Sequence, residues 1–278
     1  RQRQMCIRDS RKGKWKTTPT PAFAKKRLIY QDGQNPFEEG TARFASTEKK
    51  PEKAFAQWIP RIPETGKYAV YVTYQTLPES VSDAKYLVFH KGGVTEFLVN
   101  QQIGGGTWVY LGTFEFDKGT NDYGMVVLSN ESRQKGVVCA DAVRWGGGMG
   151  NIARGGTTSG LPRYLEGARY AAQWSGFPYP VYSPSEGKND YTDDINARSR
   201  VINYLSGNSV YNPKEKGLGV PFEMTLGVHS DAGFSKEDEL IGTLGIYTTD
   251  YNNGELNAGI SRLSLIHISE PTRLQLIS

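Results

Sequence analysis

The chain has 278 residues, which is enough for one large or two ordinary domains. Its formal net charge of +4 is small and scattered along the sequence, and this argues against a nucleic-acid partner. The apolar runs are shorter than the roughly 18 residues that a membrane helix needs, so the sequence predicts no membrane span. With two cysteines, Cys6 and Cys139, it predicts no disulfide framework. The 32 glycines and 16 tyrosines fit a turn-rich, strand-rich protein with aromatic side chains available to contact sugars.

Both ends of the sequence differ in character from the part between them. Residues 1–10 contain Met5-Cys-Ile-Arg-Asp9, and residues 263–278 contain Leu265-Ile-His-Ile-Ser-Glu-Pro-Thr-Arg273. Both runs resemble translated sequencing-library adapter. We therefore expect these two segments to be foreign to the natural protein, and we exclude them from the fold prediction. The part between them is then expected to be an internal fragment of a longer protein.

Residues 11–34 are basic and rich in threonine and proline. This composition predicts a solvated connector, because a charged stretch with little apolar content has no face to bury.

From Asn35 the pattern changes to short apolar and aromatic runs separated by turns. The expected strands are 66–74, 84–90, 95–100, 107–112, 113–116, 125–128 and 137–143. Runs of this length, with Gly, Asp and Asn turns about every ten positions, are typical of an antiparallel β-sandwich. His90 is expected at a strand end as a turn residue, and Cys139 as inert packing within a buried strand.

Several spaced motifs in this region resemble the golvesin/xanthan-lyase carbohydrate-binding-type domain. They are Trp58-Ile-Pro, Gly66-Lys-Tyr-Ala-Val-Tyr71, His90-Lys-Gly-Gly93, Gly105-Gly-Thr-Trp108 and Ala140-Asp-Ala-Val-Arg144. The resemblance covers about residues 35–147 and implies a jelly-roll-like sandwich with a glycan-binding or accessory role. Exposed aromatic rings would stack on sugar faces, and the candidates are Trp58, Trp108 and Tyr110. The spacing of Trp58 and Trp108 fits core packing as well, so both alternatives stay open.

A glycine-rich run, 146–156, lacks the spacing of a phosphate-binding loop and is interpreted as a flexible domain boundary. The elements expected after it are a helix over 159–174, a helix over 190–205 capped by Asp190 or Thr192, a strand ending at His229 and a strand over 241–249. The predicted fold class is therefore α+β. It consists of an antiparallel β-sandwich followed by an incomplete α/β portion over 148–262.

The second half resembles the zinc-dependent N-acetylmuramoyl-L-alanine amidases. The matching features are Asp190, Arg198 and Asn203 on one helix, then His229-Ser-Asp-Ala232, then Gly242-Thr and Tyr247. The resemblance is closer still to Bacteroidetes proteins labelled xanthan lyase or amidase, in which a golvesin-type domain interrupts the amidase fold.

This resemblance implies that His229 is a Zn²⁺ ligand, with Asp231 beside it and Arg198 in the cleft. Zinc hydrolases need three protein ligands and an open position for water. The family's other ligands and its catalytic glutamate find no match in this sequence, so no catalytic residue is assigned. Glu166 is a candidate cleft carboxylate, with an ion pair to Arg163 or Arg169 as its alternative role.

The leading hypothesis is a piece of a periplasmic or extracellular zinc amidase that acts on peptidoglycan or another polysaccharide and carries an inserted glycan-binding sandwich. The piece itself is expected to be inactive, because its metal site is incomplete. Two alternatives stay open, a non-catalytic carbohydrate-binding module and a polysaccharide lyase.

Overall fold

The computed structural model describes residues 9–49, 53–222 and 225–227, together with Glu255 and Ser261. The chain divides into two compact units, Arg1–Val220 and Pro221–Ser278. All the helices and longer strands that the structure describes lie in the first unit. None of these described helices is long and apolar enough to cross a membrane.

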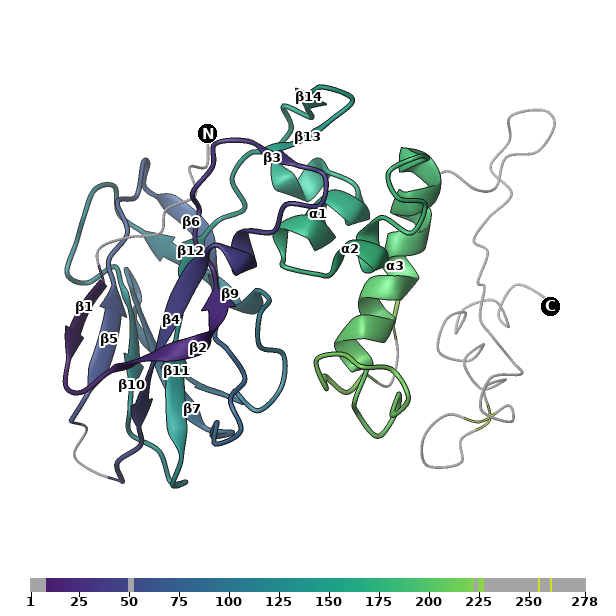
Figure 1. The fold of residues 1–278 in the computed structure, drawn as a ribbon. Helices are drawn as coiled ribbons and strands as arrows, with labels where there is room; N and C mark the ends of the chain where they lie inside the picture. The colour runs from purple at the N-terminus through teal and green to yellow at the C-terminus, as the bar shows by residue number, and fades with distance from the viewer. Residues whose placement is uncertain (1–8, 50–52, 223–224, 228–254, 256–260, 262–278) are drawn as a thin grey trace, which may run out of the picture. The chain divides into compact units, whose positions relative to one another are not determined.

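The first unit is built mainly from antiparallel sheets (Figure 1). One sheet has the strand order β1 (Asp9–Lys12), β5 (Phe55–Trp58), β10 (Val126–Ser129), β7 (Ala84–His90) and β8 (Gly93–Val99). A second has the order β11 (Val137–Ala140), β4 (Gly40–Ser46) and β2 (Lys16–Ala22). A third has the order β12 (Val143–Trp145), β6 (Gly66–Val72) and β9 (Val109–Phe116). The predicted antiparallel β-sandwich is confirmed.

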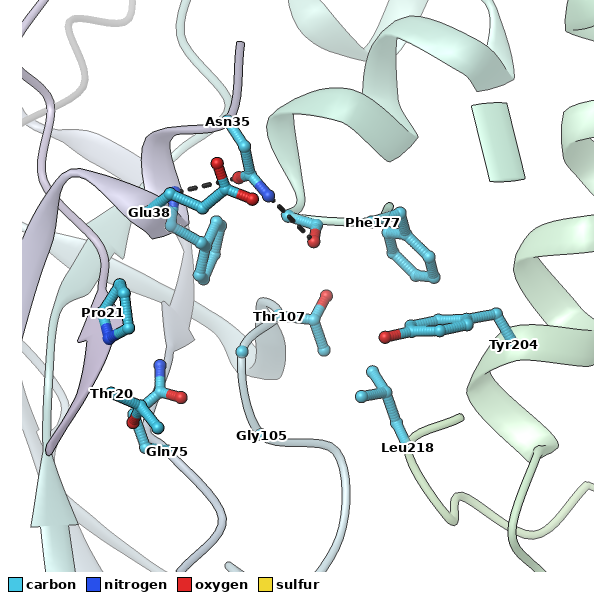
Figure 2. A pocket seen from close by; sticks show the side chains of 13 residues that line it. Thr20, Pro21, Asn35, Glu38, Gln75, Gly105, Thr107, Phe177, Tyr204 and Leu218 are labelled. Atoms are coloured by element: carbon cyan, nitrogen blue, oxygen red, sulfur yellow. Dashed lines mark hydrogen bonds between the residues drawn. The ribbon is translucent and has the colours of Figure 1, made fainter. Parts of the chain in front are cut away.

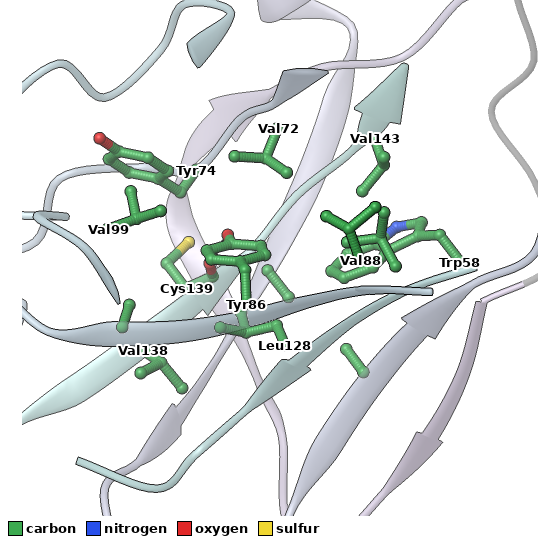
Figure 3. Packing of buried hydrophobic residues seen from close by; sticks show 14 of the residues in the cluster. Trp58, Val72, Tyr74, Tyr86, Val88, Val99, Leu128, Val138, Cys139 and Val143 are labelled. Atoms are coloured by element: carbon green, nitrogen blue, oxygen red, sulfur yellow. The ribbon is translucent and has the colours of Figure 1, made fainter. Parts of the chain in front are cut away.

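A single apolar core holds these three sheets together (Figure 3). Alternate residues of β7, such as Tyr86 and Val88, point into it, as the period of two in a strand requires. Cys139 is fully buried there, and burial raises the pKa of its thiol to about 12. Because a thiol with this pKa stays protonated, Cys139 is inert packing, as predicted.

The end of the predicted strand 137–143 is interrupted at Asp141. The chain leaves β11 after Ala140 and enters β12 at Val143. Between them, Oδ2 of Asp141 accepts a hydrogen bond from the backbone N–H of Phe23 at 3.1 Å. Burial raises the pKa of this carboxyl from 3.8 to about 7.

Replacing Asp141 with asparagine is expected to stabilise the protein at pH 8 and to change little at pH 4. A folded pKa above the unfolded value means that stability falls as the pH rises from about 4 to about 7. Asparagine is neutral throughout and can still accept from Phe23, so Asp141→Asn should raise the free energy of unfolding by up to about 4 kcal/mol above this window. Urea unfolding of both proteins across this pH range is the measurement. Parallel pH profiles would contradict the assignment.

The prediction of a solvated connector over residues 11–34 is corrected by the structure, because part of this segment belongs to the sandwich. Strand β2 pairs with β4 at the edge of its sheet and buries Thr18 and Ala22. Prolines at 19 and 21 are tolerated because an edge strand leaves backbone N–H groups unpaired on one side. The pairing register of β2 also shifts between Thr17 and Pro21. This irregularity breaks the alternating pattern by which a strand is predicted from sequence.

The prediction of a flexible domain boundary over residues 146–156 is also corrected, because part of this segment pairs with other strands. Strand β13 (Ile152–Arg154) pairs in parallel with β3 (Tyr30–Gln31) and antiparallel with β14 (Thr157–Thr158). A second apolar cluster then joins residues from both sides of the expected boundary, namely Phe23, Tyr30, Phe37, Ala142, Ile152 and Trp174. The sandwich and the segment up to Val220 therefore form one compact unit.

The remaining elements are helical. They are η1 (Pro36–Glu38), η2 (Arg163–Leu165), α1 (Ala168–Trp174), α2 (Tyr179–Tyr182) and α3 (Asp190–Ser206). The helix predicted over 159–174 is shortened to α1, and the helix predicted over 190–205 is confirmed as α3. Its N-terminal cap is Asn189 rather than Asp190 or Thr192, with Asn189 Oδ1 accepting from Thr192 N at 3.0 Å. The two predicted strands of the α/β portion lie mostly outside the described residues.

Candidate functional site

Trp58 was a candidate for sugar stacking, and the structure corrects this. The side chain is 4% exposed, in the core cluster. Strand β5 lies between β1 and β10, and its alternate residues Ala56 and Trp58 face inward. A buried ring offers no face to a polysaccharide, so Trp58 is a packing residue.

Trp108 is half-buried and belongs to the second apolar cluster. Its ring lies 4.7 Å from that of Phe23 and 5.5 Å from that of Phe37, both in edge contacts. The guanidinium of Arg144 covers it at 4.9 Å. Because these neighbours pack against the indole ring, Trp108 also fits the packing alternative.

Tyr110 is the one predicted glycan-binding residue with an exposed ring. It is 55% exposed, and its hydroxyl shares a hydrogen bond of 2.8 Å with that of Thr113. Its ring lies 5.3 Å from that of Tyr71 on the neighbouring strand β6. Tyr110 therefore remains available for stacking on the outer surface of the sandwich.

The predicted cleft residues do not come together in the described part of the chain. Glu166 follows η2, where it accepts from Ser159 Oγ at 2.7 Å and pairs with Arg163 at 3.6 Å. This is the alternative that the sequence left open for Glu166. Arg198 lies half-exposed on α3, paired with Asp194 at 3.1 Å. His229 and Asp231 lie outside the described residues.

The structure offers another candidate, a pocket between the sandwich and the helical segment, which we call the junction pocket (Figure 2). It has a volume of about 370 Å³. Its lining includes Thr20, Asn35, Glu38, Gln75, Gly105, Thr107, Phe177, Tyr204 and Leu218.

One wall of the junction pocket is aromatic. The rings of Phe177 and Tyr204 meet edge to face, with 5.7 Å between their centroids. The hydroxyl of Tyr204 points into the pocket (Figure 2). Burial raises the pKa of this phenol, so it stays protonated and can donate a hydrogen bond to a ligand.

The opposite wall is polar and held in place by hydrogen bonds. Asn35 Oδ1 accepts from the backbone N–H of Phe37 at 2.9 Å, and its Nδ2 donates to the carbonyl of Gly176 at 3.3 Å. This second bond joins the sandwich side to the helical side. The carboxamide of Gln75 lies toward the pocket (Figure 2) and offers both a donor and an acceptor.

The loop that forms the floor of the junction pocket contains Gly105, which lets its backbone lie close to Thr76. A Cβ at this position would lie 2.4 Å from the backbone nitrogen of Thr76, which is closer than real side chains come. The backbone N–H of Gly105 donates to Thr76 Oγ1 at 3.2 Å. The close approach that Gly105 permits thus shapes the pocket.

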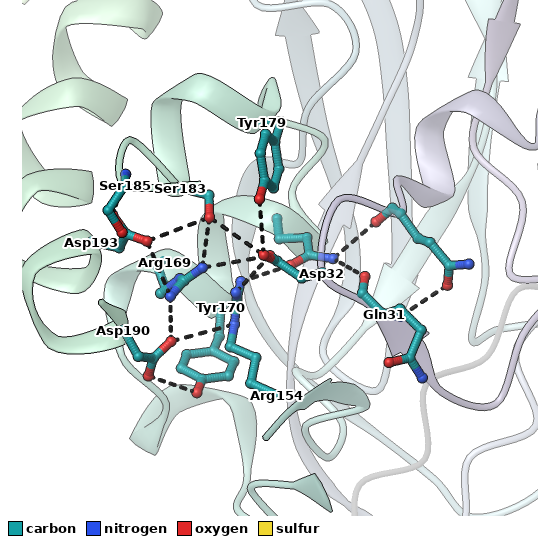
Figure 4. A network of polar contacts seen from close by, with 12 residues as sticks. Gln31, Asp32, Arg154, Arg169, Tyr170, Tyr179, Ser183, Ser185, Asp190 and Asp193 are labelled. Carbon is teal, nitrogen blue, oxygen red and sulfur yellow. Dashed lines mark hydrogen bonds and ion pairs between the residues drawn. The ribbon is translucent and has the colours of Figure 1, made fainter. Parts of the chain in front are cut away.

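A network of charged and polar side chains fixes the helical segment against residues 31–34, which lie between β2 and β4 in the sequence (Figure 4). Arg169 of α1 is 1% exposed and pairs with Asp190, with Asp193 at 3.4 Å and with Asp32 at 3.5 Å. Arg154 also binds Asp32, at 2.6 Å. Because these charges satisfy one another, the network serves to hold the helical wall of the junction pocket in position.

The network is extended by Gln173 of α1. Its Nε2 donates to the backbone carbonyl of Gln31 at 2.7 Å and to that of Gln34 at 3.1 Å. Its Oε1 accepts from Arg154 at 2.8 Å. Asn35, a pocket residue, directly follows Gln34, so the network and the junction pocket are joined through adjacent residues.

Comparison with known proteins supports the golvesin/xanthan-lyase-type domain. Residues 31–146 match the family model described as Golvesin C-terminal domain. This stretch runs from the end of β3 through β12 and so contains most of the sandwich. The chain is also similar to a xanthan lyase from Bacillus sp. (strain GL1), with 34% identity over 90 residues, which is 32% of this chain and 10% of that protein. The chain thus spans about a tenth of the length of this curated relative.

Similar solved structures include a Paenibacillus xanthan lyase, with 24% identity, a TM-score of 0.40, and coverage of 51% of this chain and 12% of that one. Another is the C-terminal CBM6 of LamC from Zobellia galactanivorans, with 19% identity, a TM-score of 0.28, and coverage of 48% of this chain and 99% of that one. TM-scores below 0.5 do not establish a shared fold. The family assignment for this stretch rests on the sequence matches.

Proposed function

We propose that the protein binds a polysaccharide and that a sugar unit occupies the junction pocket. The observation that carries this proposal is the arrangement of Phe177 and Tyr204 opposite the amide groups of Asn35 and Gln75. A sugar ring presents C–H groups on its faces and hydroxyls around its edge, so it needs an aromatic wall on one side and hydrogen-bonding groups on another.

Two further observations support the proposal. The pocket is preformed, because the bond from Asn35 to Gly176 already joins its two sides, so binding needs little rearrangement. The golvesin-type domain supplies the sandwich wall, and the curated relative is named for its action on xanthan, a polysaccharide.

The experiment is affinity electrophoresis of the full chain through gels that contain different polysaccharides. The wild-type protein is expected to be retarded by at least one of them. Tyr204→Leu keeps the apolar packing against Phe177 but removes the flat ring and its hydroxyl. It should weaken binding about thirtyfold, since a lost stack and a lost hydrogen bond contribute about 1 kcal/mol each.

Tyr123→Leu is the matched control, because Tyr123 is 54% exposed and lies outside the junction pocket. It should migrate like the wild type. Equal retardation of the wild type and Tyr204→Leu, with both folded, would contradict the pocket assignment. No retardation by any polysaccharide would contradict the function.

A second candidate function, zinc amidase activity, concerns the part of the chain that holds His229. It is favoured by the parallel pairing of β3 with β13, which brings together the two ends of the golvesin-type stretch, as an insertion into another domain would require. Among the described residues, however, no three His, Cys, Asp or Glu side chains gather closely enough to hold a metal ion. The described residues therefore do not fit a zinc site.

Zinc titration of the full chain tests this second candidate. Stoichiometric binding that is lost in His229→Ala would support it, and binding that is the same in both proteins would contradict it. A polysaccharide lyase is not favoured at the junction pocket, because a lyase base must lose its proton readily while burial raises the pKa of Tyr204.

A further inference from the structure

We propose that a second groove, separate from the junction pocket, binds the carboxylates of acidic polysaccharides. This lysine groove has a volume of about 530 Å³, and its lining includes Gly13, Lys14, Lys16, Phe44, Lys53 and Asn130. The inference rests on the polysaccharide binding proposed above and adds the chemical class of the polysaccharide.

The lysine groove carries an excess of positive charge. Its lining contains three lysines and one acidic residue, Glu48, so three positive charges against one negative give a net charge of +2. Lys53 is paired with Glu48 at 3.3 Å. Lys14 and Lys16 have no acidic partner among the described residues, and both are exposed. These two ammonium groups are free to bind an anion.

The backbone around the lysines is held in a defined conformation. Gly13 adopts a φ of +93°, and a Cβ there would lie 2.5 Å from that of Ala54, so the turn before β2 lies directly against the start of β5. Asn130 is 2% exposed, and its Oδ1 accepts from the backbone N–H groups of Lys53 and Ala54 at 3.1 and 2.9 Å. The lysines of two distant segments are thereby kept on one groove.

The neighbour of Lys16 indicates a sugar acid rather than a simple anion. Lys16 of β2 and Phe44 of β4 are cross-strand partners, and both line the lysine groove. Side chains at such paired positions lie close together. A uronic acid could place its ring against Phe44 and its carboxylate on Lys16, whereas an inorganic ion would use only the lysine.

Nucleic acid fits this groove less well than an acidic glycan. Each nucleotide carries a phosphate, and tight binding of a strand relies on many cationic contacts with a steep salt dependence. A net charge of +2 at the groove offers few such contacts.

The test compares polygalacturonate with pectin whose carboxylates are fully methyl-esterified, so that the two glycans share a backbone and differ in charge. Binding of the full chain is measured by calorimetry at low and high salt. The double variant Lys14→Gln/Lys16→Gln should bind polygalacturonate about tenfold more weakly at low salt. Its binding to the esterified pectin should be unchanged.

The matched control is Lys67→Gln/Lys118→Gln, which removes the same net charge from exposed positions outside the lysine groove. It should leave both affinities unchanged. An equal loss in the two double variants, equal wild-type binding to the two glycans, or tighter binding of a thymidine oligonucleotide through the same lysines would each overturn the inference.

The failure of this inference can be told apart from the failure of the proposed function. If Tyr204→Leu weakens binding to polysaccharide and Lys14→Gln/Lys16→Gln does not, the assignment of the lysine groove is wrong and that of the junction pocket is supported. If the wild type binds neither these glycans nor any other polysaccharide, both proposals fail.

Discussion

Replacing Arg169 with methionine is expected to lower the free energy of unfolding by about 3 to 5 kcal/mol. The guanidinium is 1% exposed, and its partners include Asp193, which is 0% exposed. Methionine preserves much of the side-chain volume but removes the positive charge. It therefore leaves a buried carboxylate without its main cation, which is the costly way to break a buried ion pair.

Arg198→Met is the matched control, because Arg198 also forms an ion pair with an aspartate of α3 but is 50% exposed. Its loss should change stability by no more than about 0.5 kcal/mol. Urea unfolding of the three proteins is the measurement. A loss below about 1 kcal/mol in Arg169→Met would show that the network of Figure 4 does not hold the helical segment in place.

Replacing Trp174 with alanine is the second large effect, with an expected loss of about 3 to 5 kcal/mol. The indole is 1% exposed and meets the rings of Tyr30 and Phe23 edge to face at 5.4 and 5.9 Å. The guanidinium of Arg163 covers it at 4.0 Å. Removing it leaves a cavity between α1 and the segment that joins β2 to β4.

The same variant tests whether the sandwich and the helical segment are one compact unit. Because they share the cluster around Trp174, far-UV circular dichroism and the fluorescence of the remaining tryptophans, which include Trp58 and Trp145 of the sandwich core, should report one transition, shifted to lower denaturant. Tyr164→Ala is the control, since Tyr164 is 77% exposed and should matter little. Two separate transitions would instead support a domain boundary near residue 147.

Several elements could be predicted from the sequence because their pattern is local. Strand β7 (Ala84–His90) alternates between core and surface, and its predicted bounds match the structure. Helix α3 matches within one residue, although its cap is the preceding asparagine. Strand β2 was missed because its prolines lie on an edge strand, where the rule against proline in sheets does not apply.

The candidate site depended more on long-range packing and was harder to predict. Trp58 and Tyr110 are both aromatic strand residues, yet one is 4% exposed and the other 55%. Which ring faces solvent depends on how the sheets stack, and no local pattern fixes this. The junction pocket joins Asn35, Gln75 and Tyr204, which lie far apart along the chain, so its aromatic and polar walls carry no sequence motif.

The most direct test is a crystal structure of the full chain with an oligosaccharide from a polysaccharide that retards it. We expect a sugar ring in the junction pocket, against Tyr204 on one side and within hydrogen-bonding distance of Gln75 on the other. An oligosaccharide bound on the outer surface at Tyr110, with the junction pocket occupied by water alone, would contradict it.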